Sequence, residues 1–182
     1  ILTPGEGQVK AFICTSANPV ISSPNGTKVE EALSSLDFMV SIDFYLNETS
    51  RLADIILPPT GPFEHEQYDI IFNMLAVRNV TKFSSPLFKQ KSYMRSDNQI
   101  FQEITKRINK LKSKGKIGAQ VKGRAMGLLG DYLTPERTVD LLLRTGPYGD
   151  GLKGLLNPLP SKGLTLKKLK EQVHGMDLGP MK

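Results

Sequence analysis

Two short apolar stretches, each stopped abruptly by residues that end strands, constrain this chain most. Phe38–Ile42 ends at Asp43, and Ile55–Leu57 ends at Pro58 and Pro59. Apolar runs of this length between such stops are typical of strands buried on both faces of a parallel sheet. Because parallel sheets bind ligands at the carboxyl ends of their strands, Asp43 is a candidate ligand-binding residue.

The segment before these stretches completes a βαβ unit. Val9–Cys14 is a first candidate strand, and it leads into a polar corner that ends at Asn18-Pro19. Thr27 and Glu30 have the spacing of a helix capping box. An apolar stripe at helical spacing accompanies them, formed by Val29, Ala32, Leu33 and Leu36. Strand, helix and strand in this order predict an α/β fold, a doubly wound parallel-sheet (Rossmann-like) domain.

The remainder of the chain is expected to combine helices with long loops. Pro58–Pro86 shows no clear periodicity and is predicted to be irregular. The predicted elements after it are a helix Ile100–Leu111 capped by Ser96 and Gln99, a helix opened by Thr134-Pro135-Glu136, a loop Gly146–Gly163, a short basic helix Thr165–Val173 and an extended exit His174–Pro180. We expect residues 1–112 to form a portion of an α/β domain. Residues 113–182 are expected to form a helical and loop extension that leads to a further C-terminal domain.

Composition restricts the class of protein. The 182 residues are 39% hydrophobic and 23% charged, which is typical of a soluble globular protein. No apolar run approaches the roughly 20 residues that cross a bilayer, and the first residues lack a signal-peptide pattern, so we expect a cytoplasmic protein. Ile1 in place of a start methionine suggests a cut into a longer protein. The single Cys14 excludes an internal disulfide and a thiolate metal cluster built by this chain alone.

A run of basic residues accounts for much of the net charge of +6. No acid interrupts the eight residues Lys106, Arg107, Lys110, Lys112, Lys114, Lys116, Lys122 and Arg124. One interpretation is the solvated end of a helix and the loop after it, where cations are favoured. The other is a patch for nucleic acid, an anionic partner or acidic lipid. We favour the first, because like-charged runs usually lie at the surface and no aromatic residue is interleaved for base stacking.

Catalytic patterns are scarce. The only histidines, His65 and His174, lie far apart in sequence, and neither has a second His or Cys at metal-ligand spacing. The chain contains no GxSxG elbow, P-loop or GxGxxG. We therefore predict no catalytic residue and no metal ligand in this chain.

A binding role has better support. An ionised Asp43 offers two acceptor oxygens, which match the adjacent N1–H and N2–H donors of guanine. Asn47, Thr49 and Ser50 follow where a helical turn starts, and its free N–H groups would suit phosphate or sugar oxygens. The alternative is purely structural: Asp43 ends a strand, and Asn47 or Thr49 caps a helix.

These residues together resemble the molybdopterin oxidoreductases of the dimethyl sulfoxide reductase and formate dehydrogenase family. The resemblance covers about Val9 to Glu66. It comprises a strand ending near Asn18-Pro19, a helix, a strand ending in Asp43 with the acidic-Thr turn Asn47-Glu48-Thr49, and the closing segment Ala53-Asp54-Ile55-Ile56-Leu57-Pro58.

The resemblance implies a role in cofactor binding. Family members carry molybdenum or tungsten between two pyranopterin guanine dinucleotides, and this chain resembles part of their third domain, which binds one guanine dinucleotide. Position by position, Asp43 would hold the guanine base, and Asn18, Pro19, Asn47 and Thr49 would line the cofactor. Ser16-Ala17 stands where many relatives have Gly-Gly or Gly-Glu. Asn47 stands where many have Thr.

The resemblance also implies what lies outside the chain. The iron–sulfur domain and the metal-ligating Ser, Cys or selenocysteine region have no counterpart here, so we expect the chain alone to be inactive. Its expected partners are the remaining domains of the parent enzyme, with a small-molecule substrate, and neither nucleic acid nor a membrane span. The competing hypothesis is a non-catalytic structural module on the same fold, as in the large iron–sulfur subunit of respiratory complex I.

Overall fold

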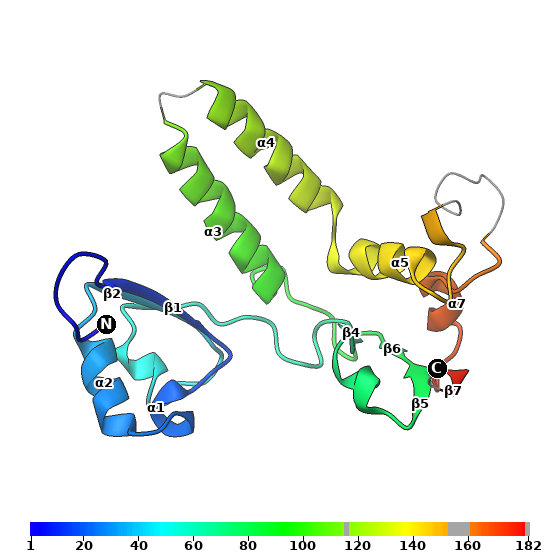
Figure 1. Cartoon of the computed structure of the whole chain (residues 1–182), viewed down its shortest axis with the longest axis horizontal. Helices are drawn as coiled ribbons and strands as arrows, with labels where there is room; N and C mark the ends of the chain where they lie inside the picture. The colour runs from blue at the N-terminus through cyan, green and yellow to red at the C-terminus, as the bar shows by residue number, and fades with distance from the viewer. Residues whose placement is uncertain (115–116, 153–160, 181–182) are drawn as a thin grey trace. The chain divides into compact units, whose positions relative to one another are not determined.

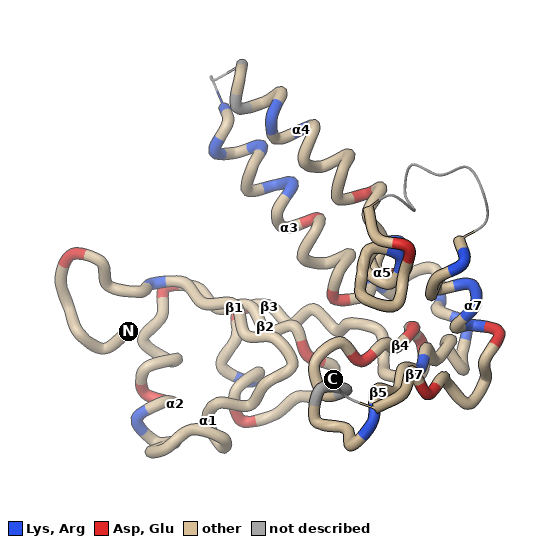
Figure 2. Tube along the Cα trace, turned by 45° about the vertical axis from the view of Figure 1, so that its right-hand side comes forward, with Lys and Arg blue, Asp and Glu red and all other residues tan. Residues whose placement is uncertain are grey.

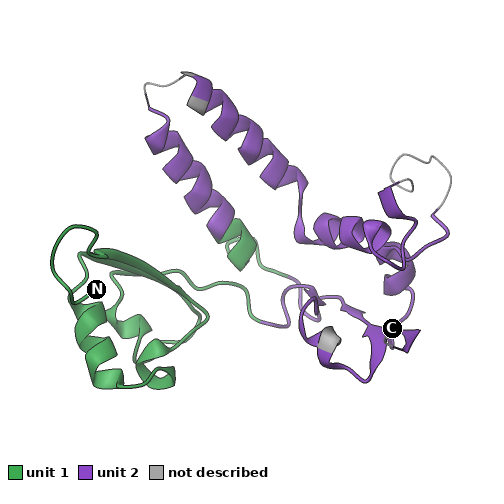
Figure 3. Ribbon diagram, viewed as in Figure 1, with its two compact units in different colours: residues 1–61, 90–100 green, residues 62–89, 101–182 purple. Residues whose placement is uncertain are grey.

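The computed structural model of the chain describes residues 1–114, 117–152 and 161–180, and it contains two units (Figures 1 and 3). Unit 1 comprises residues 1–61 and 90–100, and unit 2 comprises residues 62–89 and 101–182. Among the described residues, no helix combines the length and apolarity that crossing a bilayer requires.

A parallel sheet organises unit 1. Its strands are β1 (Ala11–Thr15), β2 (Phe38–Ile42) and β3 (Ile55–Ile56), in the order β1-β2-β3. The register pairs Thr15 with Ile42 at the carboxyl ends of the first two strands. The predicted α/β class with a parallel sheet is therefore confirmed, although β1 begins two residues later than predicted and β3 ends one residue earlier.

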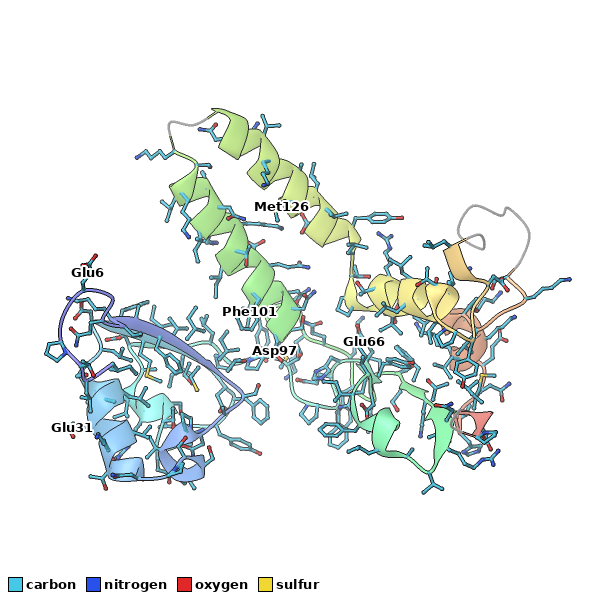
Figure 4. The ribbon with its side chains drawn as sticks, viewed as in Figure 1. Glu6, Glu31, Glu66, Asp97, Phe101 and Met126 are labelled. Carbon is cyan, nitrogen blue, oxygen red and sulfur yellow. The ribbon has the colours of Figure 1, made fainter. Side chains whose placement is uncertain are left out.

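Helices cover one face of this sheet. α1 (Pro19–Ser22), α2 (Gly26–Ser34) and the 3-10 helix η1 (Ser50–Leu52) belong to this layer (Figure 1). Cys14, Leu33 and Met39 form the buried core between the helices and the sheet. Burying one leucine side chain such as Leu33 contributes about 1.5–3 kcal/mol to folding. Figure 4 shows Glu31 on α2, where it is exposed.

The opposite face of the sheet is only partly covered by the described residues. Ile13, Phe38 and Ile55 lie on this face and are 42%, 44% and 45% exposed. Met39, Val40, Ser41 and Ile42 are all buried. Burial on both faces, as predicted, therefore holds for most of β2 but not for Phe38 or for Ile55 in β3.

The predicted capping box of α2 is wrong. The helix begins at Gly26, and Asn25 caps it by accepting the Lys28 N–H at 3.2 Å. Asn25 has a φ of 59°, a left-handed conformation that asparagine tolerates better than most residues. Glu30 reaches Arg51 instead, at 2.5 Å.

Unit 2 contains two short antiparallel ribbons. β4 (Gln67–Tyr68) pairs with β6 (Phe83–Ser84), and β5 (Arg78–Thr81) pairs with β7 (Met176–Pro180). The segment predicted to be irregular thus contains three short strands and the 3-10 helix η2 (Phe72–Leu75). The predicted extended exit of the chain is β7, and Arg78 on β5 pairs with Asp177 on it at 2.8 Å.

Two helices pack over these ribbons. α5 (Pro135–Thr145) begins where predicted, with Thr134 accepting the Arg137 N–H, and α7 (Leu166–Lys170) has Thr165 as its cap. Phe83, Val139, Leu166 and Leu169 form the buried core of this unit. The basic helix ends at Lys170, three residues earlier than predicted. Residues 153–160 of the predicted loop Gly146–Gly163 lie outside the described residues.

A helical hairpin replaces the loop expected after the first long helix. α3 (Asp97–Lys112) is capped as predicted, with the Ser96 N–H donated to Gln99 Oε1 at 3.0 Å. The unpredicted helix α4 (Ile117–Tyr132) follows it and lies beside it (Figure 1). Gln102 donates to the Gly130 carbonyl at 3.0 Å, and Lys106 pairs with Asp131 at 2.6 Å. Figure 4 labels Phe101 and Asp97 on α3 and Met126 on α4.

Glycines explain both why α4 was missed and how it packs. A Cβ at Gly123 or Gly127 would lie 3.7 Å or 3.8 Å from side-chain atoms of α3, so these glycines face the partner helix. A Cβ at Gly118 or Gly130 would meet nothing within 4 Å.

Gly130→Ala is therefore expected to stabilise α4. Alanine loses less backbone entropy than glycine in a helix, and the gain should be about 0.5–1 kcal/mol. Thermal unfolding followed by circular dichroism would show a higher midpoint. Gly149→Ala is the matched control of opposite sign, since its Cβ would collide with the Arg144 carbonyl. A lower midpoint for Gly130→Ala would contradict the open space at this position.

Candidate functional site

The corner after β1 and the turn after β2 are joined by a buried threonine. The Thr49 hydroxyl donates to Asn18 Oδ1 at 2.7 Å and accepts the Val20 N–H at 3.2 Å. Thr49 is fully buried, and Asn18 is half-buried. Asn18 Nδ2 donates in turn to Glu48 Oε2 at 2.8 Å. One side chain thus links two segments that lie about thirty positions apart in the sequence.

Asp43 and Asn47 organise the turn itself. Asp43 Oδ1 accepts the Tyr45 N–H at 2.9 Å, and Asp43 Oδ2 accepts from Asn47 Nδ2 at 3.2 Å. Asn47 Oδ1 accepts the N–H groups of Thr49 and Ser50 at 3.0 Å and 2.9 Å. Four of the five predicted residues, Asn18, Asp43, Asn47 and Thr49, are therefore joined by hydrogen bonds at the carboxyl ends of β1 and β2. Pro19 is the first residue of α1 and is not part of this hydrogen-bonded cluster.

The prediction about free N–H groups in this turn is wrong. The Thr49 and Ser50 amides, expected to be open for phosphate or sugar oxygens, are both satisfied by Asn47 Oδ1. Asn47 thus has the capping role that the structural alternative assigned to it. The cluster contains two acids, Asp43 and Glu48, and one adjacent cation, Arg51, which pairs with Glu30 and donates to the Glu48 carbonyl at 3.3 Å. This charge pattern favours ligand groups that donate hydrogen bonds.

Two members of the cluster were missing from the predicted site. Ser50 is fully buried, accepts the Asn47 N–H at 2.8 Å and donates to the Tyr45 carbonyl at 2.9 Å. Glu48 reaches Asn18, which lies thirty positions earlier. No local sequence pattern indicates a contact with so distant a residue. Ser50, in contrast, could have been included, because it directly follows Thr49 in the same turn.

The corner between β1 and α1 has an unusual backbone. Ser16 has a φ of 47°, in the left-handed region that favours glycine. Its N–H donates to the Ile42 carbonyl at 3.0 Å, which holds the corner against the end of β2. Cys14, just before this corner, is buried and donates to the Ala17 carbonyl at 3.4 Å. Burial, followed by the nearby charge of Asp43, raises the pKa of the Cys14 thiol, so its labelling in the native state should be slow.

Glu48 provides a test of the link to Asn18. The hydrogen bond from Asn18 lowers the pKa of the Glu48 carboxyl, with smaller contributions from its own N–H and from Arg51. Because the pKa is lower in the folded chain, the ionised pair favours folding above the unfolded-state pKa, and this contribution is lost as pH falls through the folded value. Asn18→Ala is expected to return the Glu48 pKa towards its usual range, as measured by carboxyl NMR titration. An unchanged titration would contradict the bond, and Arg51→Gln, which removes a smaller contribution, is the control.

The basic run lies on the α3–α4 hairpin. The predicted helix end is present, but the loop predicted after it is mostly the helix α4. Lys122 and Arg124 belong to helix α4, not to a loop (Figure 2). Lys106 pairs with Glu103 and Asp131, and hydrogen bonding to Asp131 raises its pKa. Lys116 lies outside the described residues. Within the described ranges, no three His, Cys, Asp or Glu side chains gather closely enough to hold a metal ion.

Comparison with known families identifies a related group of proteins. The family model described as Molybdopterin oxidoreductase matches residues 2–107, more than half of the chain. The matched segment includes the whole hydrogen-bonded cluster at the ends of β1 and β2.

Individual relatives extend this similarity. Probable oxidoreductase YyaE of Bacillus subtilis (strain 168) is 26% identical over 174 residues, which are 96% of this chain and 21% of that protein. The assimilatory nitrate reductase catalytic subunit of the same strain is 41% identical over 61 residues, 34% of this chain and 9% of the relative. The F420-dependent formate dehydrogenase subunit alpha of Methanocaldococcus jannaschii is 46% identical over 50 residues, 28% of this chain and 7% of the relative. The chain thus spans about a fifth or less of these relatives.

Proposed function

This chain belongs to the molybdopterin oxidoreductase family, and we propose that its unit 1 binds the guanine nucleotide portion of a molybdopterin guanine dinucleotide. The observation that carries the proposal is the single hydrogen-bonded cluster that joins Asp43, Asn47, Thr49 and Asn18. The cluster lies at the carboxyl ends of two parallel strands, where α/β sheets bind ligands.

The chemistry of Asp43 fits a guanine base. Each carboxylate oxygen accepts one hydrogen bond within the turn, and each retains a further lone pair. These internal bonds orient the carboxylate before any ligand arrives. The N1–H and N2–H groups of guanine would then donate to the two oxygens side by side, and charge-assisted bonds of this kind are among the strong ones.

The other residues have distinct roles in this proposal. Thr49 and Asn18 hold the corner after β1 against the turn after β2, so that both flank the bound nucleotide. Ser16 has a left-handed backbone at the corner where many members of the resembled family have glycine, a residue that adopts this conformation easily. The metal of the bound cofactor supplies oxygen-atom or electron-pair transfer, and this chain's residues bind and orient the nucleotide end.

For the whole protein, the support is the match to the molybdopterin oxidoreductase family. We propose that the full protein is a molybdenum or tungsten oxidoreductase, whose metal ligand, iron–sulfur cluster and substrate site belong to other segments. The 182 residues alone are then expected to show no turnover with an artificial electron acceptor. Turnover by the purified chain would overturn this part of the proposal.

The direct test is equilibrium binding of GDP and ADP to the purified chain by calorimetry. GDP is expected to bind at least tenfold more tightly, because adenine presents an acceptor at N1 and no donor at C2. IDP, which lacks the 2-amino group, is expected to lie between them. Equal binding of GDP and ADP would overturn the cradle proposal and favour the non-catalytic structural module.

A further inference from the structure

An exposed aromatic pair follows the strand end that carries Asp43. Ile42 is fully buried, yet the next apolar residues after Asp43 are largely exposed: Phe44 is 49% exposed, Tyr45 69% and Leu46 77%. The rings of Phe44 and Tyr45 lie 4.7 Å apart between centroids, with an interplanar angle of 57°. Three consecutive exposed apolar side chains beside a polar cluster form a patch of the kind that marks binding surfaces.

Hydrogen bonds on both sides of Tyr45 hold the loop that presents these rings. The Tyr45 N–H is bound by Asp43 Oδ1, and the Tyr45 carbonyl accepts from Ser50, which is fully buried. The backbone on both sides of the ring is therefore fixed before a ligand binds. Ordering such a loop is one of the costs of binding, and here the internal hydrogen bonds already meet it.

We propose that Phe44 and Tyr45 form the stacking surface for the purine base whose edge Asp43 binds. This inference rests on the proposed guanine site and deepens it. A purine offers a polar edge and an apolar face, and recognition in water needs a partner for each. Asp43 offers acceptors for the edge, and the aromatic pair, which begins at the adjacent residue, offers apolar area for the face.

The two contributions have different selectivity. Hydrogen bonds to Asp43 depend on the donors of the base, so they separate guanine from adenine. Stacking depends on the ring face, which every purine has, so it strengthens all purine nucleotides alike. The proposed ligand of the aromatic pair is therefore a purine nucleotide, and the competing possibility is a protein segment that covers the rings.

The chain contains no tryptophan, so a single one introduced at this position becomes a clean reporter. In Tyr45→Trp, GDP and ADP are each expected to quench the indole emission in proportion to their binding. Tyr93→Trp is the matched control, because Tyr93 is also in unit 1 and is 74% exposed. Its emission should not respond to either nucleotide.

Affinity measurements complete the test. Tyr45→Ala is expected to weaken GDP and ADP by the same factor, about tenfold, and so to leave the preference for GDP intact. Tyr45→Leu keeps apolar area but removes the ring face, and it should behave like Tyr45→Ala. Both variants retain the backbone bonds to Asp43 and Ser50, since these use only main-chain atoms of residue 45.

Failure of this inference differs from failure of the proposed function. Suppose that the unaltered chain prefers GDP, that Tyr45→Ala and Tyr45→Leu bind both nucleotides as before, and that the indole emission of Tyr45→Trp stays constant. The stacking surface is then wrong and the guanine site stands, and a protein segment would be the better occupant of the rings. If the unaltered chain binds neither nucleotide, the guanine site and the stacking surface are both overturned.

Discussion

Replacing Asp43 by asparagine is expected to remove the preference for GDP over ADP. The variant keeps one acceptor oxygen for the Tyr45 N–H, but its amide group replaces the second acceptor with a donor. The new donor would then face the guanine donor and also Asn47 Nδ2, which donates to Asp43 Oδ2 in the unaltered chain. Loss of a charge-assisted hydrogen bond costs about 1.5–3 kcal/mol, so GDP affinity should fall by about 10- to 150-fold while ADP affinity changes little.

Calorimetry with GDP, IDP and ADP would measure this change, and two controls make it interpretable. Asp37→Asn removes an exposed acid of the same unit that pairs with Lys10 at 3.4 Å, outside the cluster. It should leave all three affinities unchanged. Thermal unfolding of Asp43→Asn would show whether the turn survives. A folded Asp43→Asn chain that still prefers GDP would refute base recognition by this carboxylate.

Thr49→Val should have the largest effect on stability. Valine has nearly the same shape, but it can neither donate to Asn18 Oδ1 nor accept the Val20 N–H. Two partly buried polar groups, Asn18 Oδ1 and the Val20 N–H, would lose their partner, and such a loss costs about 1–3 kcal/mol for a buried group. We therefore expect the free energy of unfolding of unit 1 to fall by about 2–4 kcal/mol.

The single cysteine offers a measurement specific to unit 1. Cys14 is buried in the core of this unit, so its reaction with a thiol reagent in increasing urea reports the opening of the sheet and helix layer. The Thr49→Val chain should become reactive at a lower urea concentration. Thr27→Val, at an exposed position in the first turn of α2, is the matched control. Equal labelling profiles for the Thr49 variant and the unaltered chain would show that the link adds no stability.

Local sequence patterns predicted the elements whose signals are short-range. Ser96 with Gln99 and Thr134 with Pro135 mark helix starts through bonds between neighbours, and both caps are confirmed. α3 nevertheless begins at Asp97, three residues before the predicted Ile100. Phe38–Ile42 was predicted at its observed bounds, because apolar content and a polar stop define a buried strand locally. α4 was missed, since its four glycines lower the intrinsic helix propensity and only packing against α3 compensates.

Several members of the candidate site were predicted from the sequence, but Glu48, Ser50 and the pattern of hydrogen bonds were not. Asp43, Asn47 and Thr49 are neighbours in one turn, and Asn18 was placed beside them by the parallel order of the strands. The sequence could not show that Asn47 Oδ1 accepts the N–H groups of Thr49 and Ser50, because those bonds depend on the backbone path of the turn. It also could not show that the side chains of Asn18 and Glu48 meet. The predicted boundary between residues 112 and 113 stays a prediction.

By itself, the sequence determined the βαβ order, the acid at the end of β2 and the kinship with molybdopterin oxidoreductases. These depend on composition and spacing over a few residues, where local sterics and burial decide the outcome. Only the tertiary structure decided that Thr49 bonds to Asn18 and that Arg78 meets Asp177. Such contacts join residues 31 and 99 positions apart, and they depend on strand register and helix packing, which no local pattern encodes.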